Sequence, residues 1–159
     1  MDARELLVDT IAHIRPAHAV EHLTPEDAER RVPGANHSIA EIVAHLNFWA
    51  GWFCDRCEGI HAPMVTSAAS GWPAVVPGSW PELHARFLTT LHRAVALGDD
   101  PGRLASRLIP AIEFPPLANY TIRDAIVHIG THNAHHLGQV IILRQLMGLW
   151  PPPSGSWTW

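Results

Sequence analysis

Apolar side chains recur along this chain with the 3.6-residue period of amphipathic α-helices. The pattern predicts a helix that starts near the N-terminus and is kinked or ended by Pro16, because proline interrupts the hydrogen bonding of a helix. Three longer helices are predicted over about residues 38–57, 80–97 and 121–147. No segment alternates apolar and polar residues over the length of a strand, so the sequence predicts an all-α fold.

Hydroxyl side chains mark the starts of the three longer helices. Each is followed three residues later by a carboxylate, the spacing of a capping box that satisfies backbone N–H groups of the first turn. The pairs are Ser38 with Glu41, Ser79 with Glu82, and Thr121 with Asp124. A further threonine, Thr24, precedes Pro25 and predicts a short helical turn.

Two long connections, residues 58–78 and 99–120, separate the predicted helices and contain several glycines and prolines. The length of 159 residues matches one domain rather than two. We therefore predict a single domain over residues 1–159 that forms a four-helix bundle with long crossover loops. Such bundles build metal sites in their core from side chains on facing helices.

Charge and hydropathy narrow the classes of function. The formal charge is −4 and all 11 basic residues are scattered arginines, so we expect no nucleic-acid partner. The absence of lysine excludes Schiff-base chemistry and a phosphate-binding loop with its lysine. No apolar run approaches about 18 residues, and the N-terminus lacks the pattern of a signal peptide, so we expect a cytoplasmic protein with no membrane partner.

Two cysteines, Cys54 and Cys57, form a C-x-x-C pair at the end of the second predicted helix. A zinc knuckle would need a second cysteine pair, and a redox pair would be expected at the start of a helix, where the thiol pKa is lowered. We therefore interpret these cysteines as reduced thiols with a structural or incidental role.

Histidine is the unusual component, with 12 residues, and four of them lie within nine positions of the last predicted helix: His128, His132, His135 and His136. At about 100° per residue they fall on one face, and histidines four positions apart can chelate one metal ion. Two such pairs overlap, His128 with His132 and His132 with His136, and spacing alone does not choose between them. A third ligand must come from another helix, and His45 is the best candidate because it borders the apolar stripe of the second helix.

The other histidines fit a metal site less well. Five lie near helix ends or in loops, where a solvated or hydrogen-bonded ring is expected: His13, His18, His22, His37 and His61. His84 lies on the apolar side of the third helix and is a candidate for a buried structural role or for contact with a ligand residue. His92 is expected at the surface.

Three stretches of the sequence resemble the DinB-like, or YfiT-like, family. They are residues 34–49, GANHSIAEIVAHLNFW, residues 132–139, HNAHHLGQ, and residues 143–153, LRQLMGLWPPP. The resemblance extends over nearly the whole chain and implies a four-helix bundle that is usually dimeric. It also implies that one histidine of the second helix joins an H-x-x-x-H pair of the last helix around a divalent metal ion.

Carried over residue by residue, this resemblance selects His45, His132 and His136 as the metal ligands. Four neighbours are expected to surround these ligands or to line the pocket: His128, His135, Gln139 and Trp49. Zinc or nickel is the expected ion, with iron as a further candidate, because imidazole suits all three. Three imidazoles would leave coordination positions for water or substrate, as in catalytic metal sites.

The family resemblance also implies an activity, since the superfamily includes bacillithiol transferases and a mycothiol-dependent isomerase. It favours a metal-dependent thiol S-transferase in detoxification or stress response, acting on a small-molecule electrophile and a low-molecular-weight thiol. We expect a homodimer from the same resemblance and from the seven tryptophans. Three of the tryptophans, Trp150, Trp157 and Trp159, are expected to fold back over the bundle.

Two other functions stay open at the level of the sequence. One is a hydrolase that uses metal-bound water as its nucleophile, although no glutamate accompanies the histidines as in H-E-x-x-H. The other is a non-enzymatic, metal-binding, dimeric stress protein whose bundle serves interaction.

Overall fold

The computed structural model describes residues 2–155, and within them the only strand-like pairing is an isolated antiparallel bridge between Arg107 and Thr121. The helical elements along the described chain are α1 (Ala3–Leu7), α2 (Pro16–Val20), α3 (Pro25–Glu29), α4 (Ile39–Cys57), the 3-10 helix η1 (Ala68–Gly71), α5 (Trp80–Gly98), the 3-10 helix η2 (Pro115–Leu117) and α6 (Ile122–Leu146). The prediction of an all-α fold is confirmed. None of the described helices combines the length and the apolar character needed to cross a membrane.

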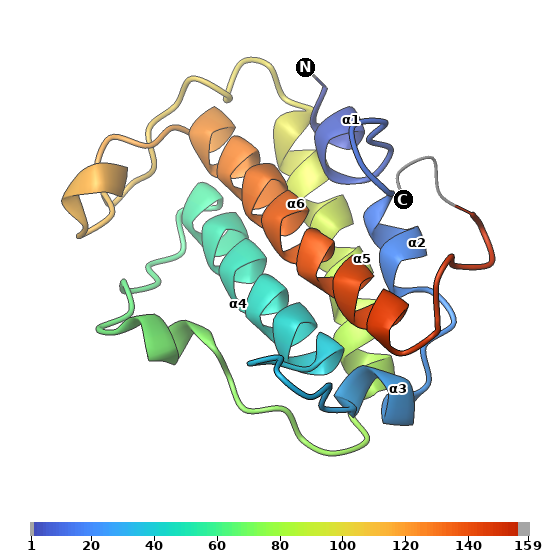
Figure 1. The fold of residues 1–159 in the computed structure, drawn as a ribbon. Helices are drawn as coiled ribbons and strands as arrows, with labels where there is room; N and C mark the ends of the chain where they lie inside the picture. Colours follow the sequence, from blue (N-terminus) through green and yellow to red (C-terminus); the bar gives the residue numbers. More distant parts are fainter. Residues whose placement is uncertain (1, 156–159) are drawn as a thin grey trace.

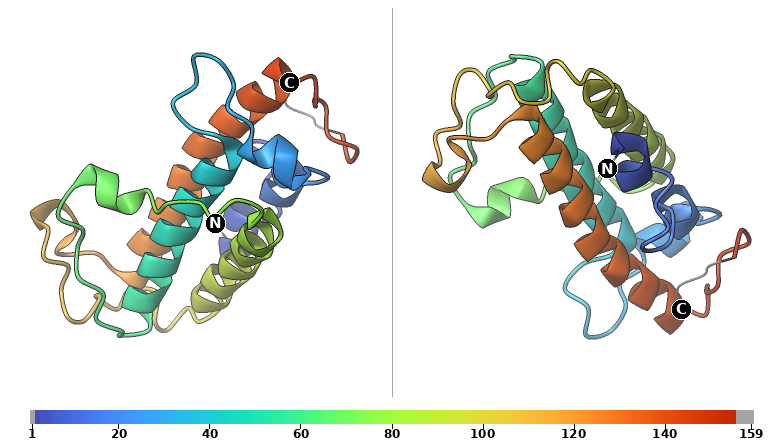
Figure 2. Two further views of the ribbon diagram at one scale, coloured as in Figure 1. Left: turned by 90° about the horizontal axis from the view of Figure 1, so that it is seen from below. Right: turned by 90° about the horizontal axis from the view of Figure 1, so that it is seen from above.

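Three long helices, α4, α5 and α6, form the body of the molecule (Figure 1). α4 packs against both α5 and α6, and the views from below and above show the three helices side by side (Figure 2). The apolar stripe predicted for the second helix lies in this core on α4: Ile39, Ile42, Val43, Leu46, Ala50 and Phe53 are all buried. Removal of these side chains from water stabilises the packed helices by about 25 cal/mol for each Å² of apolar surface.

The N-terminal side of the bundle differs from the sequence prediction of one helix up to Pro16. α1 ends at Leu7, and Pro16 is the first residue of α2. Proline suits the first position of a helix because its φ is already helical and its missing N–H has no partner to lose there. Between the two helices Ile11 is 96% exposed, whereas Ile14 is buried. Two short helices therefore pack against α5 and α6 in place of the predicted long one.

The predicted capping boxes form at two of the three long helices. Reciprocal side-chain and backbone hydrogen bonds join Ser38 with Glu41 and Thr121 with Asp124, and the short α3 has the same box between Thr24 and Asp27. The prediction for Ser79 is wrong, because its backbone has left the extended conformation of a cap, with ψ of 9°, and its side chain makes no capping bond. The start of α5 is fixed instead by the Trp80 indole, which donates to the Leu23 carbonyl over 2.8 Å.

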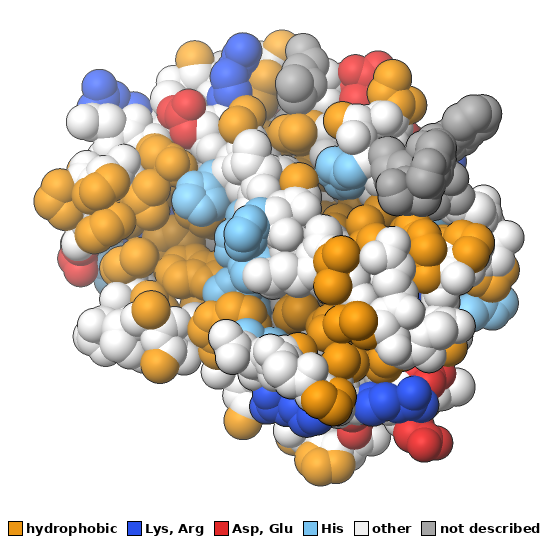
Figure 3. Space-filling view, in the orientation of Figure 1, with side chains coloured by type: hydrophobic (Ala, Val, Ile, Leu, Met, Phe, Trp, Pro, Cys, Tyr) orange, Lys and Arg blue, Asp and Glu red, His pale blue; other side chains and the backbone are white. Residues whose placement is uncertain are grey.

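The two long connections, residues 58–79 and 99–121, are both attached to the C-terminal end of α4. The buried guanidinium of Arg56 donates to the carbonyls of Ala62 in the first connection and Pro110 in the second. These bonds hold both connections against the bundle. The face on which they lie contains a hollow with hydrophobic side chains on its walls, and histidines gather along one edge of it (Figure 3).

Cys54 and Cys57 are buried in the core near the end of α4 and are not paired in a disulfide. Burial raises the pKa of the Cys54 thiol to about 12 and that of the Cys57 thiol to about 11, so both stay protonated near neutral pH. This environment supports the interpretation of the pair as structural thiols.

The described end of the chain folds back onto the N-terminal region. The buried Arg144 guanidinium donates to the backbone carbonyl of Glu21. Ser154 donates to the Glu21 carboxylate through both its backbone N–H and its hydroxyl group. Trp150 is half-buried against the core, in line with the expected folding back of the tail. Trp157 and Trp159 lie outside the described residues.

Candidate metal centre

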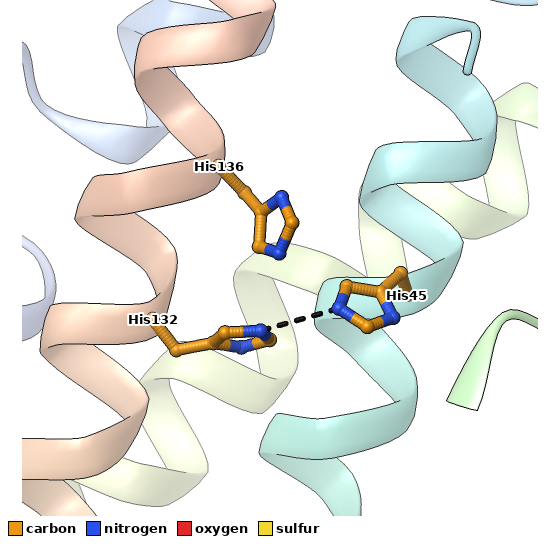
Figure 4. Close-up of side chains that lie close together, drawn as sticks. All are labelled: His45, His132 and His136. Atoms are coloured by element: carbon orange, nitrogen blue, oxygen red, sulfur yellow. Dashed lines mark hydrogen bonds between the residues drawn. The ribbon is translucent and has the colours of Figure 1, made fainter. Parts of the chain in front are cut away.

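Three histidines from two helices meet where α4 and α6 face one another, and their rings point toward a common centre (Figure 4). His45 comes from the second turn of α4, and His132 and His136 come from successive turns of α6. The Nε2 atoms of His45 and His132 lie 3.2 Å apart. One ring nitrogen from each of the three residues lies within 4.8 Å of the other two.

The choice between the two overlapping H-x-x-x-H pairs is visible in this arrangement. His132 and His136 both approach His45, with ring centroids 5.0 and 4.7 Å from it. His128 lies one turn before His132 on α6. Its ring centroid is 6.1 Å from that of His132, and it is not part of the cluster of three. The structure therefore brings together the three residues selected from the family resemblance.

Outer hydrogen bonds fix the orientation of two of the three rings. His45 Nδ1 donates to the Gly71 carbonyl over 2.7 Å, and His136 Nδ1 donates to the side-chain oxygen of Gln139 over 2.7 Å. A neutral imidazole carries one N–H, so both residues keep an unprotonated Nε2 facing the centre. Outer partners of this kind hold metal-binding histidines in the correct tautomer.

Burial favours the neutral form that a metal ion requires. His45 and His136 are each 6% exposed. Desolvation, reinforced by the neighbouring imidazoles, lowers the pKa of His45 to about 4 and that of His132 to about 3. The pKa of His136 is lowered by the same cause, against the opposing effect of its Gln139 hydrogen bond. All three rings are therefore neutral near pH 7.

The donor set fits a divalent transition-metal ion. Two imidazole nitrogens bound to one tetrahedral zinc ion lie about 3.3 Å apart, because each Zn–N bond is about 2.0 to 2.1 Å long. The separation of 3.2 Å between the Nε2 atoms of His45 and His132 matches this value. Neutral imidazole is also a ligand for nickel and iron. The three histidines are thus positioned so that they could bind one divalent metal ion.

The indole of Trp72 is a part of the centre that the sequence analysis missed. The ring centroids of His37 and His45 each lie 3.8 Å from the ring centroid of Trp72, and both imidazole planes are within 11° of parallel to the indole. Two rings so close to one indole cannot share a face of it, so Trp72 lies between the two imidazoles. His37, which we expected to be solvated or simply hydrogen-bonded, is half-buried in this stack. Trp72 belongs to the connection between α4 and α5, which has no helical periodicity, so no pattern in the sequence indicates the stack.

The four expected neighbours of the cluster have different positions. Gln139 bonds directly to His136, and Trp49 packs against the backbone of Gly71 beside the cluster. His128 lies 3.2 Å from the Tyr120 hydroxyl through its Nδ1 atom. His135 is exposed, and its ring meets that of His136 edge to face with centroids 4.8 Å apart. Of the remaining histidines, His84 is half-buried beside Trp80 on α5 and His92 is exposed, as expected.

The family of the chain follows from a comparison of its sequence with known families. The profile of the DinB superfamily matches residues 12–140, a span that contains all three clustered histidines. The chain belongs to the DinB superfamily. Searches of curated proteins and of solved structures find no match. The membership agrees with the helical bundle, and in this DinB superfamily protein the centre of three histidines lies within the matched region.

Proposed function

We propose that this DinB superfamily protein binds a divalent metal ion through His45, His132 and His136 and uses it as a thiol S-transferase. One observation carries the metal site: the Nδ1 atoms of His45 and His136 are already engaged by outer partners, which leaves their Nε2 atoms directed at the same point as His132. Zinc and nickel are the first candidates for the ion, and iron follows.

Three protein ligands suit a catalytic site better than a closed structural one. A divalent ion held by these three histidines would have positions open for a small molecule, and it would lower the pKa of a thiol or water bound there. In the proposed reaction the thiol releases its proton to water and its sulfur forms a bond to a carbon of the electrophile. The bond between that carbon and the leaving group breaks, and the leaving group departs with its electron pair. The neutral histidines hold the site, and burial keeps competing water away from most of its surface.

We also propose that the protein works as a homodimer in the cytoplasm, in detoxification or the stress response. The outward face of α6 supports a dimer, because Ile142 and Leu146 are 54% and 65% exposed. The exposed residues of this helix from Val127 to Leu146 include no Asp, Glu or Arg. A self-complementary, uncharged helix face is suited to packing against the same face of a second copy.

The test begins with protein purified without a histidine tag, since a tag would itself bind metal. We expect about one equivalent of divalent metal per chain, and metal-dependent loss of a small thiol in the presence of an electrophile such as 1-chloro-2,4-dinitrobenzene. The His45→Ala variant is the matched inactive control.

The alternative outcomes are informative. Turnover of an activated ester by the metal-loaded protein, without thiol consumption, would replace the transferase with a hydrolase. Metal binding without either activity would indicate a non-enzymatic metal-binding protein. Wild-type protein that binds no divalent metal would refute the whole proposal.

A further inference from the structure

A hydroxyl and an imidazole lie together beside the metal centre and take no part in it. Tyr120 is the last residue but one before α6, and its hydroxyl oxygen lies 3.2 Å from Nδ1 of His128 on the second turn of that helix. Both side chains are half-buried, so they reach the surface of the molecule. His128 is followed one turn later by His132, which belongs to the centre.

Two aromatic residues of α4 lie between the three clustered histidines and the pair of Tyr120 and His128. Trp49 and Phe53 follow His45 at intervals of four residues, so the three lie on one face of the helix. The ring centroid of Phe53 lies 4.6 Å from that of His128 and 6.2 Å from that of Tyr120. Since Phe53 meets His128 while His45 meets His132 and His136, α4 and α6 run antiparallel, and the aromatic residues extend away from the centre at one end.

The aromatic residues beside the polar pair determine which ligands this region favours. Phe53 is 1% exposed, whereas Trp49 and Tyr120 are half-buried, so part of each of these two residues stays accessible to solvent. The ring centroids of Trp49 and Phe53 lie 6.5 Å apart. Flat aromatic walls favour a flat ligand, because aromatic rings gain from offset stacking and edge-to-face contact beyond the area they bury.

The polar pair supplies one hydrogen-bond donor to this wall. A tyrosine hydroxyl has one hydrogen, and a neutral imidazole has one N–H. One of these two hydrogens is used in the bond between the residues, whichever of them donates it. The other hydrogen remains, on Nε2 of His128 or on the Tyr120 oxygen, and among residues 2–155 neither side chain has a second hydrogen-bond partner. Burial lowers the pKa of His128, so the neutral form on which this count depends is the one present near pH 7.

We propose that Tyr120 and His128 determine substrate specificity by binding an acceptor oxygen of a planar, aromatic substrate whose ring lies against Trp49 and Tyr120. This rests on the proposed function, because it gives a chemical class to the electrophile: an aromatic compound with a carbonyl or similar oxygen next to the ring. Trp49, Phe53, Tyr120 and neutral His128 carry no formal charge, so we expect a neutral substrate rather than an organic anion or cation.

The test uses three small probes that differ in one property each. Acetophenone has the ring and the oxygen, ethylbenzene lacks the oxygen, and methyl cyclohexyl ketone lacks the aromatic ring. Binding is measured by ligand-observed NMR on the wild-type protein, with and without added zinc. We expect acetophenone to bind about 3-fold to 10-fold more tightly than ethylbenzene, the range of one net hydrogen bond, and more tightly than the cyclohexyl ketone.

Variants then assign the oxygen preference to the pair. Tyr120→Phe and His128→Phe each leave one donor hydrogen on the remaining residue, so each single variant should keep part of the preference for acetophenone over ethylbenzene. The double variant has no donor and should bind the two probes equally. His92→Phe, at an exposed position of α5, is the control and should behave as the wild type.

The result can overturn the inference without reference to the metal. Equal binding of acetophenone and ethylbenzene by wild-type protein, or an unchanged preference in the double variant, would refute it. Should the double variant fail to fold, ¹⁵N-histidine NMR of the wild type decides, because acetophenone and not ethylbenzene must shift the His128 resonances. Metal content is measured in the same samples, so absence of metal with an intact probe preference would refute the proposed function alone.

Discussion

Replacement of Gly71 by alanine tests whether the first long connection controls the metal centre. Gly71 ends η1 and is buried, and its carbonyl accepts the hydrogen bond from His45 Nδ1. A Cβ added there would lie 2.7 Å from Nε1 of Trp49 and 3.0 Å from its Cε2. Atoms of this kind prefer separations of about 3.5 Å or more, so the backbone or the indole must move by about 0.8 Å.

The direction of that movement determines the effect on the metal. Trp49 is wedged against Phe48 and Trp52, with ring centroids 5.3 and 5.8 Å away, so we expect the connection rather than the indole to retreat. A shift of about 0.8 Å would lengthen the 2.7 Å bond between His45 and the Gly71 carbonyl to about 3.5 Å, which is beyond hydrogen-bond range. Loss of such an outer partner weakens metal affinity by about 10-fold to 100-fold.

The assay is competition for zinc between the protein and a chromophoric chelator, with thermal unfolding of the metal-free protein measured alongside. Gly51→Ala is the matched control, because a Cβ at that position of α4 meets nothing within 4 Å. It should keep wild-type affinity and slightly stabilise the helix. Adding Trp49→Leu to Gly71→Ala makes room for the new methyl group, and should restore part of the lost affinity.

One result would refute this reasoning directly. If Gly71→Ala folds and binds zinc as tightly as the wild type, the carbonyl does not set the affinity of His45. An equal loss of affinity in Gly51→Ala would show that the effect is not specific to the contact with Trp49.

Three further predictions address the ligands, the effect of pH and the oligomer. His136→Ala should lose the metal while exposed His135→Ala loses at most 100-fold in affinity, and the opposite order in metal analysis would reverse the assignment. The pKa values of His45 and His132 are lowered from 6.5 to about 4 and about 3, so the unfolded chain binds protons first as the pH falls. The metal-free protein should therefore lose stability between about pH 6.5 and pH 4, and unfolding temperatures that stay constant over this interval would contradict this. Ile142→Glu should convert the proposed dimer to a monomer in sedimentation experiments, whereas a wild-type monomer would leave no dimer to disrupt.

The helices of this fold could be predicted where local signals and burial agree. The capping boxes at Ser38 and Thr121 combine a side-chain hydrogen bond with an apolar stripe that begins directly after them, and both helices start where predicted. The N-terminal helix was predicted wrongly because Leu7 and Ile14 are both buried, as one helix would require, but reach the core from separate segments. Periodicity reports which residues are apolar, and it does not show whether the backbone between them is continuous.

The ligands of the candidate centre were accessible to sequence reasoning, whereas most of their surroundings were not. Helix geometry places His132, His136 and Gln139 on one face of the last helix, but it also allows the pair of His128 and His132, and only the family resemblance selected between the two pairs. The partner of His45 is a backbone carbonyl in a connection, which has no signature in side-chain chemistry. Trp72 meets the imidazole of His45 through the path of the same connection, and that path depends on contacts distant in sequence.

The three histidines of the centre lie on packed helices, whereas several groups beside them lie in the long connections. The ring nitrogens of the three clustered histidines lie on α4 and α6, whose mutual packing is fixed by the buried core, so their geometry changes little with substitutions outside that core. Two groups that orient or flank His45 come from the first long connection, the Gly71 carbonyl and the Trp72 indole, and the Tyr120 hydroxyl beside His128 comes from the second. For the proposed metal-dependent transferase, substitution in the connections should therefore change metal affinity and substrate preference while the three histidines stay in place, because connections tolerate change far better than a packed core does.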